Sequence, residues 1–406
     1  MSDQRPSNQR PGDKRLRIGF IPLCDAAALI VAVDKGFAAA EGLDVELLRE
    51  VSWSNMRDKL NIGLFDAAHM IAPIAIASSL GLGHVKVPIV APFALGVNGN
   101  AITVSPALYA SIAAAADGPL IDPLVSARAL ARVVANRKAR GQEPLTFGMT
   151  VPFSTHNYQL RFWMAAGGVD PDEDVRLVVL PPPSMVESLA NKLVDAFCVG
   201  APWNSVAVDL GIGFILHFVS EILARAAEKV LAFRSRWAQD NAETMLNLVR
   251  AHVRAAAFIE DIANRDEVAT ILGAPNRIGV SPEVIRRTLD GRMKVAPDGT
   301  TRVDANYLLI GRDGADRPNP TQAVWLYAQM VRWGQAPLSK ELSDAAMAVF
   351  RPDLYDKAVG TAPGAAPSHA PGQPADGIGA FTGPAFDARD IGKHLTAWRI
   401  GRVPVS

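Results

Sequence analysis

The stretch that decides the fold is RLRIGFIPLCDAAALIVAVDKGF, residues 15–37. Its first eight residues predict a buried β-strand, and residues 25–37 predict a helix. The same order follows at once, with a strand over 44–51, a helix that Ser52 caps, and a strand over 66–73. Short strands that alternate with helices are typical of βα units on a parallel sheet, so the sequence predicts an α/β fold.

The alternation starts again in the middle of the chain, with strands predicted over 145–150, 176–181 and 195–200. A chain of 406 residues is too long for one ordinary core, which favours two lobes. We therefore predict a disordered tail (1–15), a first α/β lobe (16–102 plus 213–350), a second α/β lobe (103–212), and a Pro/Gly-rich mobile segment with a C-terminal extension (351–406).

The C-terminal extension regains apolar residues after its Pro- and Gly-rich part. Proline and glycine in such number prevent both helix and sheet, which is why we expect mobility there. The apolar side chains that follow can dock back on a lobe, and the candidates are Phe386, Leu395 and Trp398.

Composition excludes several classes of function. The 41 basic residues balance 41 acidic ones, and no basic run extends beyond residues 14–17, so we expect no direct contact with nucleic acid. The apolar run 26–33 is far shorter than the ~20 residues that span a bilayer, so we expect no membrane insertion. The polar N-terminal stretch lacks the apolar segment of a secretion signal, which favours a cytoplasmic location. Cys24 and Cys198 lie far apart in the sequence and form no metal-binding motif, so we expect both to be buried apolar side chains.

Two lobes joined by crossing strands create a cleft at the carboxyl ends of both sheets. Helix N-termini meet there, and their free N–H groups and partial positive charge suit a small anion. The side chains in or beside the predicted cleft loops are mostly hydrogen-bond donors, namely Trp53, Asn100, His156, Asn157 and Lys229. Singly, each has a commoner structural role, but together they favour an anion site. No nucleophile with an adjacent base and no metal or phosphate motif is evident, so we predict neither an enzyme nor a cofactor.

Several separated segments resemble one known family. They are the opening stretch from residue 17, GLDVELLREVSWSNMRDKLNIGLFDAAHMIAP (42–73), GVNGNAITVS (96–105), the segment THNYQLRFWMAAGGVDPDEDVRLVVLPPPSMVESL (155–189), DAFCVGAPWNSVAVDLGIG (195–213) and EKVLAFRSRWAQDN (228–241). The chain resembles the nitrate-binding protein family over most of its length, from residue 16 to about residue 272. That family includes NrtA-type transporter receptors and cytoplasmic NasS-type sensors, with bicarbonate receptors as close relatives.

The resemblance implies a periplasmic-binding-protein type II fold, with the anion between two lobes. The family's ligand-contacting tryptophan, histidine and lysine fall on Trp53, His156 and Lys229. Its amide contact falls on Asn100, where receptors in the family often carry the longer glutamine. The turn in VGAPW lies on the same wall of the cleft. The predicted ligand site therefore consists of Trp53, Asn100, His156, Gly200, Pro202 and Lys229.

Hydrogen-bond chemistry favours nitrate or nitrite as the ligand. Both ions accept hydrogen bonds and donate none, so N–H donors and one ammonium satisfy them. Bicarbonate also carries a hydroxyl that needs an acceptor, and Glu228 beside Lys229 leaves this ligand open.

The family contains two roles for such a site. We expect a cytoplasmic nitrate/nitrite sensor, because no secretion signal is evident. By resemblance, its partner would be an ANTAR-type RNA-binding antiterminator of nitrate assimilation, which the unliganded sensor holds inactive. The alternative is the substrate-binding component of an ABC transporter for nitrate, nitrite or bicarbonate.

Overall fold

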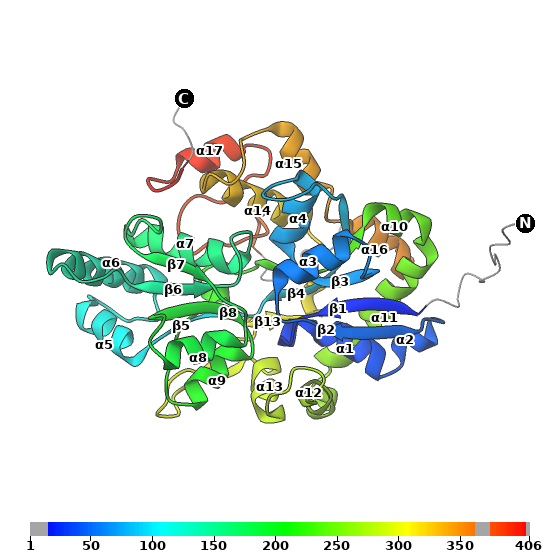
Figure 1. Ribbon diagram of the computed structural model, residues 1–406, viewed down its shortest axis with the longest axis horizontal. Helices are drawn as coiled ribbons and strands as arrows, with labels where there is room; N and C mark the ends of the chain where they lie inside the picture. Colours follow the sequence, from blue (N-terminus) through cyan, green and yellow to red (C-terminus); the bar gives the residue numbers. More distant parts are fainter. Residues whose placement is uncertain (1–14, 362–373, 403–406) are drawn as a thin grey trace, which may run out of the picture.

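In a computed structural model of the protein, residues 15–361 and 374–402 are described. They form two α/β lobes that lie side by side, each built around one β-sheet (Figure 1). The predicted α/β architecture with two lobes is therefore confirmed. Almost the whole predicted tail, residues 1–14, lies outside the described residues.

Lobe I contains a six-stranded sheet in the order β13-β4-β10-β3-β1-β2. Strand β1 pairs in parallel with β2 and β3, whereas β10 runs antiparallel to β3 and β4. Strands β3 and β4 are buried along their whole length, as expected for central strands with helices on both faces. The strands are β1 (Leu16–Phe20), β2 (Val45–Arg49), β3 (Ala67–Ile71), β4 (Ile89–Asn98), β10 (Ala227–Arg234) and β13 (Leu308–Leu309).

Lobe II contains a five-stranded sheet in the order β7-β6-β8-β5-β9. Its strands are β5 (Asn100–Val104), β6 (Thr146–Met149), β7 (Arg176–Val179), β8 (Ala196–Gly200) and β9 (Phe214–Phe218). The predicted division placed the chain in lobe I from residue 213 onward, whereas β9 belongs to lobe II. Strand β9 pairs antiparallel with β5, at the edge of the lobe II sheet. The sequence of an apolar strand does not indicate which sheet the strand joins, so composition could not assign β9 to a lobe.

Two connections between strands of different sheets pass from one lobe to the other. The first crossing joins β4 to β5 through Asn98 and Gly99, whose φ angles are 64° and 88°. The second crossing runs over residues 219–226. The Asn98 side chain joins the two crossings, because its Oδ1 accepts from the Ala226 N–H and its Nδ2 donates to the Ala224 carbonyl, both at 2.9 Å.

Helices cover both sheets. Lobe I carries the 3-10 turn η1 (Cys24–Ala26), α1 (Ala27–Asp34), α2 (Phe37–Ala40), α3 (Trp53–Asn61), α4 (Ala72–Leu80), α10 (Ser235–Asp240) and α11 (Ala242–Glu260). Lobe II carries α5 (Pro106–Ala115), α6 (Pro123–Ala139), α7 (Thr155–Gly167), α8 (Ser184–Ala190) and α9 (Trp203–Asp209). Ser52 caps α3 as predicted, since its side chain accepts from the Asn55 N–H. Within the described part of the chain, no helix is both long and apolar enough to cross a bilayer.

The segment between α11 and β13 reaches from one lobe to the other. It contains α12 (Arg265–Gly273), α13 (Pro282–Leu289), β11 (Arg292–Lys294) and β12 (Thr301–Val303). Helix α12 packs against α1 of lobe I. Arg287 and Lys294 form ion pairs with Asp209 at the end of α9, which ties this segment to lobe II.

Residues 351–406 were predicted to be a Pro/Gly-rich mobile segment and a C-terminal extension, and the predicted start of the mobile part at residue 351 is wrong. Its first residues form α16 (Pro352–Val359), which packs against α11 and β4 of lobe I. The apolar residues of this short helix pack on lobe I. The high Pro and Gly content of the stretch that follows is the reason why the sequence did not predict this helix. Residues 362–373, the centre of the Pro/Gly-rich stretch, lie outside the described residues.

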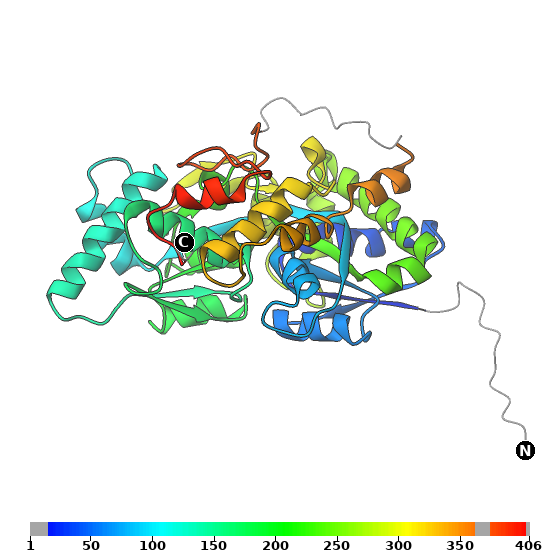
Figure 2. The same cartoon turned by 90° about the horizontal axis from the view of Figure 1, so that it is seen from above.

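The last described residues, 374–402, run back along the molecule beside α14 (Pro320–Arg332) (Figure 2). They contain α17 (Ile391–Thr396), and α15 (Lys340–Met347) packs against α14 on its other side. The expected docking is confirmed: Phe386 and Leu395 are buried, and the Trp398 ring centroid lies 4.9 Å from that of Phe162 in lobe II.

Candidate functional site

Charged side chains are buried where the two lobes meet. Glu228 and Lys229 are neighbours on β10, and Asp25 lies in η1, directly after β1. Histidines come from both lobes, His69 from β3 and His156 from α7. We call these five residues the buried charged cluster. None has more than 2% of its surface exposed, so the two lobes close over it.

Lys229 connects the two carboxyl groups of the cluster. Its Nζ lies 3.0 Å from Asp25 Oδ2 and 2.8 Å from Glu228 Oε1. The other oxygen of Asp25 lies 2.9 Å from His69 Nε2. His69 Nδ1 accepts from the Ile21 N–H at 3.4 Å, which leaves the ring proton on Nε2 to donate to Asp25. Two donors from lobe I therefore hold the Asp25 carboxylate.

Glu228 contacts lobe II. Asn100 on β5 donates its Nδ2 to Glu228 Oε2 at 2.7 Å and to Gln159 Oε1 at 3.1 Å. His156, in the first turn of α7, places Nδ1 3.4 Å from Glu228 Oε1 and 3.1 Å from Thr150 Oγ1. The carboxyl group of a lobe I strand is thus held by side chains of lobe II, which makes Glu228 a polar link between the lobes.

Trp53 covers the cluster from the first turn of α3. Its ring centroid lies 5.5 Å from that of His69, in an edge-on arrangement, and 5.3 Å from Lys229 Nζ. An ammonium at this distance from an indole face is stabilised by the ring quadrupole. The indole is 2% exposed, so it also shields the ammonium from water.

Burial and the central ammonium set the protonation states. Burial raises the pKa of Asp25, but Lys229 and His69 outweigh it and hold that pKa at about 2. Burial raises the pKa of Glu228 above its ordinary value, although Lys229 opposes the shift. Burial lowers the pKa of Lys229, but the two carboxyl groups outweigh it and raise the pKa. Burial lowers the pKa of His69, and burial together with Lys229 lowers that of His156, so both rings are neutral.

Three buried nitrogen atoms beside the cluster have no hydrogen-bond partner among the described residues. They are Trp53 Nε1, His156 Nε2 and Gln159 Nε2. The indole and amide nitrogens can only donate, and His156 Nε2 donates whenever its Nδ1 accepts. A buried donor without a partner costs about 1–3 kcal/mol. A small molecule that accepts hydrogen bonds and lies between the lobes would remove this cost.

The structure brings together four of the six predicted site residues. Trp53, Asn100, His156 and Lys229 all contact the cluster or belong to it. Gly200, at the end of β8, lies against it, because an added methyl group there would be 3.4 Å from both Asn100 Oδ1 and Asp25 Oδ2. Pro202, two residues later, occupies the N-cap position of α9.

One predicted donor has a different role. Asn157 donates to the Pro152 carbonyl and accepts from Arg161, so it stabilises the start of α7 instead of facing the cluster. Its place beside His156 in the sequence does not put the two on one face, because successive residues of a helix point about 100° apart.

Sequence reasoning missed Asp25, His69 and Gln159. The anion site was predicted from donor side chains, and the Asp25 carboxylate is an acceptor. His69 lies inside a fully buried strand, where a lone histidine has no distinguishing pattern. Gln159 lies three residues after His156 on α7, and this helical spacing is the one signal that could have found it.

A small cavity of about 60 Å³ lies between the lobes near Trp53. One wall belongs to lobe I and the other to lobe II, and its lining residues are Ser54, Arg57, Ile74, His84, Val151, Pro152 and Phe153. Two of these residues are basic by type, but Arg57 pairs with Asp58 at 2.8 Å, and burial lowers the pKa of His84.

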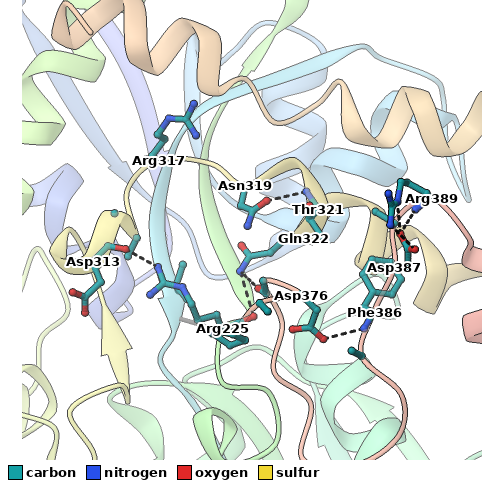
Figure 3. Close-up of a pocket in the computed structure, with 18 residues that line it drawn as sticks. Arg225, Asp313, Arg317, Asn319, Thr321, Gln322, Asp376, Phe386, Asp387 and Arg389 are labelled. Carbon is teal, nitrogen blue, oxygen red and sulfur yellow. Dashed lines mark hydrogen bonds and ion pairs between the residues drawn. The ribbon is translucent and has the colours of Figure 1, made fainter. Parts of the chain in front are cut away.

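A larger cavity of about 940 Å³ lies beneath the C-terminal segment, away from the cluster (Figure 3). Its charged lining groups have partners: Arg317 pairs with Asp356, Arg389 pairs with Asp387, and Asp376 accepts from backbone N–H groups. Acidic and basic groups alternate around it, so it does not gather charge of one sign. The buried charged cluster is therefore the better candidate for the functional site.

Residues 9–273, more than half of the chain, match the NMT1-like family. The chain belongs to the NMT1-like family. A relative, the nitrate/nitrite binding protein NrtA of Nostoc sp. (strain PCC 7120), is 30% identical over 395 residues, which are 96% of this chain and 86% of NrtA. The crystal structure of the periplasmic nitrate-binding protein NrtA from Synechocystis PCC 6803 superposes with a TM-score of 0.83 at 27% identity, over 95% of this chain and 98% of that one. The predicted periplasmic-binding-protein fold is thus confirmed.

Two further relatives of this NMT1-like chain are longer proteins. The nitrate import ATP-binding protein NrtC of Synechocystis sp. is 33% identical over 345 residues, which are 84% of this chain and 49% of NrtC. The bicarbonate transport ATP-binding protein CmpC of Synechococcus elongatus is 34% identical over 345 residues, with the same coverage. The chain therefore spans about half the length of these two relatives.

Proposed function

We propose that the protein binds nitrate or nitrite between its two lobes. The observation that carries this proposal is the set of three buried nitrogen atoms, Trp53 Nε1, His156 Nε2 and Gln159 Nε2, that lack a partner among the described residues. They come from both lobes, and the Trp53 ring centroid lies 5.3 Å from the Lys229 ammonium. An anion that only accepts hydrogen bonds satisfies all of them at once, and it does so only when the lobes are together.

The relatives support the same class of ligand. NrtA is named for binding nitrate and nitrite, and NrtC for importing nitrate. CmpC is named for transport of bicarbonate, which keeps that anion as the competing ligand. Binding without a chemical step is the proposed activity, because NrtA, which this chain matches along nearly its whole length, is named as a binding protein.

Calorimetry of the purified protein with nitrate, nitrite and bicarbonate tests the ligand. We expect one nitrate or nitrite ion to bind per chain and bicarbonate to bind weakly. Binding of bicarbonate alone would contradict the ligand assignment while leaving the family intact. Failure to bind any of the three would contradict the site.

The names of these relatives favour one role for the bound anion. We propose that the protein is the substrate-binding component of an ABC transporter for the anion that it binds. Pull-down of a membrane permease and its ATPase with the tagged protein, in a manner that depends on nitrate, is the expected result. Absence of both proteins from the eluate would contradict this role.

The regulatory role predicted from the resemblance remains a second candidate. In that role the protein is cytoplasmic and holds an ANTAR-type antiterminator until nitrate or nitrite binds. The anion releases the partner only if it binds the two-lobed closed form more tightly than the open one. Co-elution of the two proteins that nitrate abolishes would support this role, and a complex that nitrate leaves intact would exclude it.

A further inference from the structure

Glu228 is a buried acid whose carboxyl group is contacted by side chains of both lobes. Its Oε1 lies 2.8 Å from Lys229 Nζ in lobe I, and its Oε2 accepts from Asn100 of lobe II at 2.7 Å. Its side chain is fully buried. Separation of the lobes would remove Asn100 and His156 from this carboxyl group and admit water. Closure therefore takes Glu228 out of water and into a site shared with the anion.

The charge of the cluster is unfavourable for an anion if both acids are ionised. Asp25 and Glu228 would carry two negative charges against the single positive charge of Lys229. His69 and His156 are neutral, and burial together with Glu228 keeps Cys198 of β8 a thiol. These are the charged and titratable groups that face Glu228 from η1, β3, α7, β8 and β10. A nitrate ion would bring the net charge to two negatives in a buried site, which is strongly unfavourable.

Of the two acids, Glu228 is the one that can give up its charge. Asp25 is held by the ammonium of Lys229 at 3.0 Å and by His69 at 2.9 Å, and both favour its ionised form. Glu228 shares the same ammonium, and its other contacts are neutral groups: the Asn100 amide at 2.7 Å and His156 Nδ1 at 3.4 Å. A bound anion that also accepts from Lys229 competes with Glu228 for this ammonium.

A proton on Glu228 also orients His156 for the ligand. Ionised Glu228 would favour the ring proton on Nδ1, 3.4 Å from Oε1, and would leave a lone pair on the unpartnered Nε2. Once Glu228 is protonated, Nδ1 can accept from it or from the Thr150 hydroxyl at 3.1 Å. The ring proton then lies on Nε2, where it can donate to an oxyanion.

We propose that the protein takes up one proton with each nitrate or nitrite ion that it binds, and that Glu228 holds this proton. The inference rests on the proposed function, since it concerns the same site. No bond other than O–H is formed: a carboxylate and a solvent proton become a carboxylic acid. The protein thus binds, in effect, the anion together with its proton.

Calorimetry of the full chain with nitrate, at one pH near neutrality in buffers of different ionisation enthalpy, measures the number of protons taken up. We expect about one proton per anion and, by linkage, a Kd that tightens about tenfold for each pH unit of acidification while the free protein has Glu228 ionised. A proton number of zero with a Kd independent of pH would overturn the proposal. Failure to bind nitrate or nitrite at any pH would instead contradict the proposed function.

Glu228→Gln tests the assignment of the proton. The amide keeps an N–H donor near His156 and Asn100 but cannot titrate, so we expect nitrate binding with no proton uptake and no pH dependence. Proton uptake that persists in this variant would overturn the role of Glu228. The matched control is Asp316→Asn. Burial raises the pKa of Asp316 to about 6, but this acid accepts a hydrogen bond from Tyr355 and lies outside the cluster. The Asp316→Asn variant should therefore still take up one proton with each anion.

Infrared difference spectroscopy gives a second measurement that does not depend on the folding of a variant. Addition of nitrate to the native protein should produce the carbonyl band of a buried, protonated carboxylic acid. Absence of this band at saturating nitrate would overturn the proposal even if Glu228→Gln failed to fold.

Discussion

Asp25 Oδ2 lies 3.0 Å from Lys229 Nζ, and both side chains are buried at the meeting point of the two lobes. The two residues are far apart in the sequence, one after β1 and the other on β10. Their pairing places the only ammonium of the cluster within reach of two carboxyl groups, since Glu228 lies 2.8 Å away on its other side. The candidate site is therefore built around a network of ion pairs, and the hydrogen-bond donors surround this network.

Lys229→Met should destabilise the protein strongly, because it leaves Asp25 and Glu228 buried without their cation. Removal of one partner of a buried ion pair typically costs about 3–5 kcal/mol in the free energy of unfolding. Urea denaturation measures this cost, and anion binding should be lost as well. As a control, Lys340→Met removes an exposed pair with Asp344 and should leave the free energy of unfolding unchanged within error. Equal effects of the two substitutions would contradict the network.

Trp53→Phe should weaken anion binding without much loss of stability. The phenyl ring keeps most of the packing, but the unpartnered Nε1 donor is lost. A hydrogen bond to a charged group contributes about 1.5–3 kcal/mol, so Kd for nitrate should rise roughly tenfold to a hundredfold. Trp163→Phe is the control. The Trp163 indole N–H donates to the Pro123 carbonyl and to Ser126, so its loss should lower the free energy of unfolding and leave the Kd for nitrate unchanged. The reverse pattern would show that Trp53 has a structural role only.

Acid should destabilise the protein through its buried histidines, and His252 is the clearest case. Burial lowers the pKa of His252 from 6.5 to about 4 in the folded protein. The unfolded chain therefore binds the proton first as pH falls. The contribution of neutral His252 to the free energy of unfolding is complete above about pH 6.5 and is lost between there and about pH 4. The free energy of unfolding falls in this range by at most ~1.4 kcal/mol per pH unit.

His252→Gln should reduce the fall in stability between pH 7 and pH 5, because glutamine does not titrate in this range. Urea denaturation of both proteins at the two pH values measures the difference. His69, His156 and His217 also have lowered pKa values, so part of the pH dependence should remain. An unchanged slope in the variant would mean that His252 is protonated in the folded protein.

Asn98→Ala should cost more than Asn98→Gly. Both remove the side-chain hydrogen bonds in which Asn98 donates to the Ala224 and Asn306 carbonyls and accepts from the Ala226 N–H, worth about 1 kcal/mol each. Alanine adds strain because the φ angle is 64°, a region that costs an L-residue about 1–2 kcal/mol but costs glycine nothing. The two free energies of unfolding give the test. Equal values would mean that the backbone relaxes when the side chain is removed.

Local pattern was sufficient for most elements of this fold. Ser52 caps the helix that follows it, and the apolar runs at β1, β3 and β8 form buried strands, because these features depend on neighbours in the chain. The same holds for the donors Trp53 and His156, which lie in first turns of helices at the cleft. Such positions are set by the order of strands and helices, which the sequence displays directly.

Pairing between distant segments was decided only by the tertiary structure. Strand β9 has the composition of any buried strand, and only its hydrogen bonds to β5 assign it to lobe II. Asp25 is one acid among many in the sequence, and only the approach of β1 to β10 across the sheet puts it beside Lys229. Hydrophobic periodicity and capping are short-range effects, whereas charge pairing and desolvation depend on which surfaces come together, and that is why the sequence determined the elements and the fold determined the site.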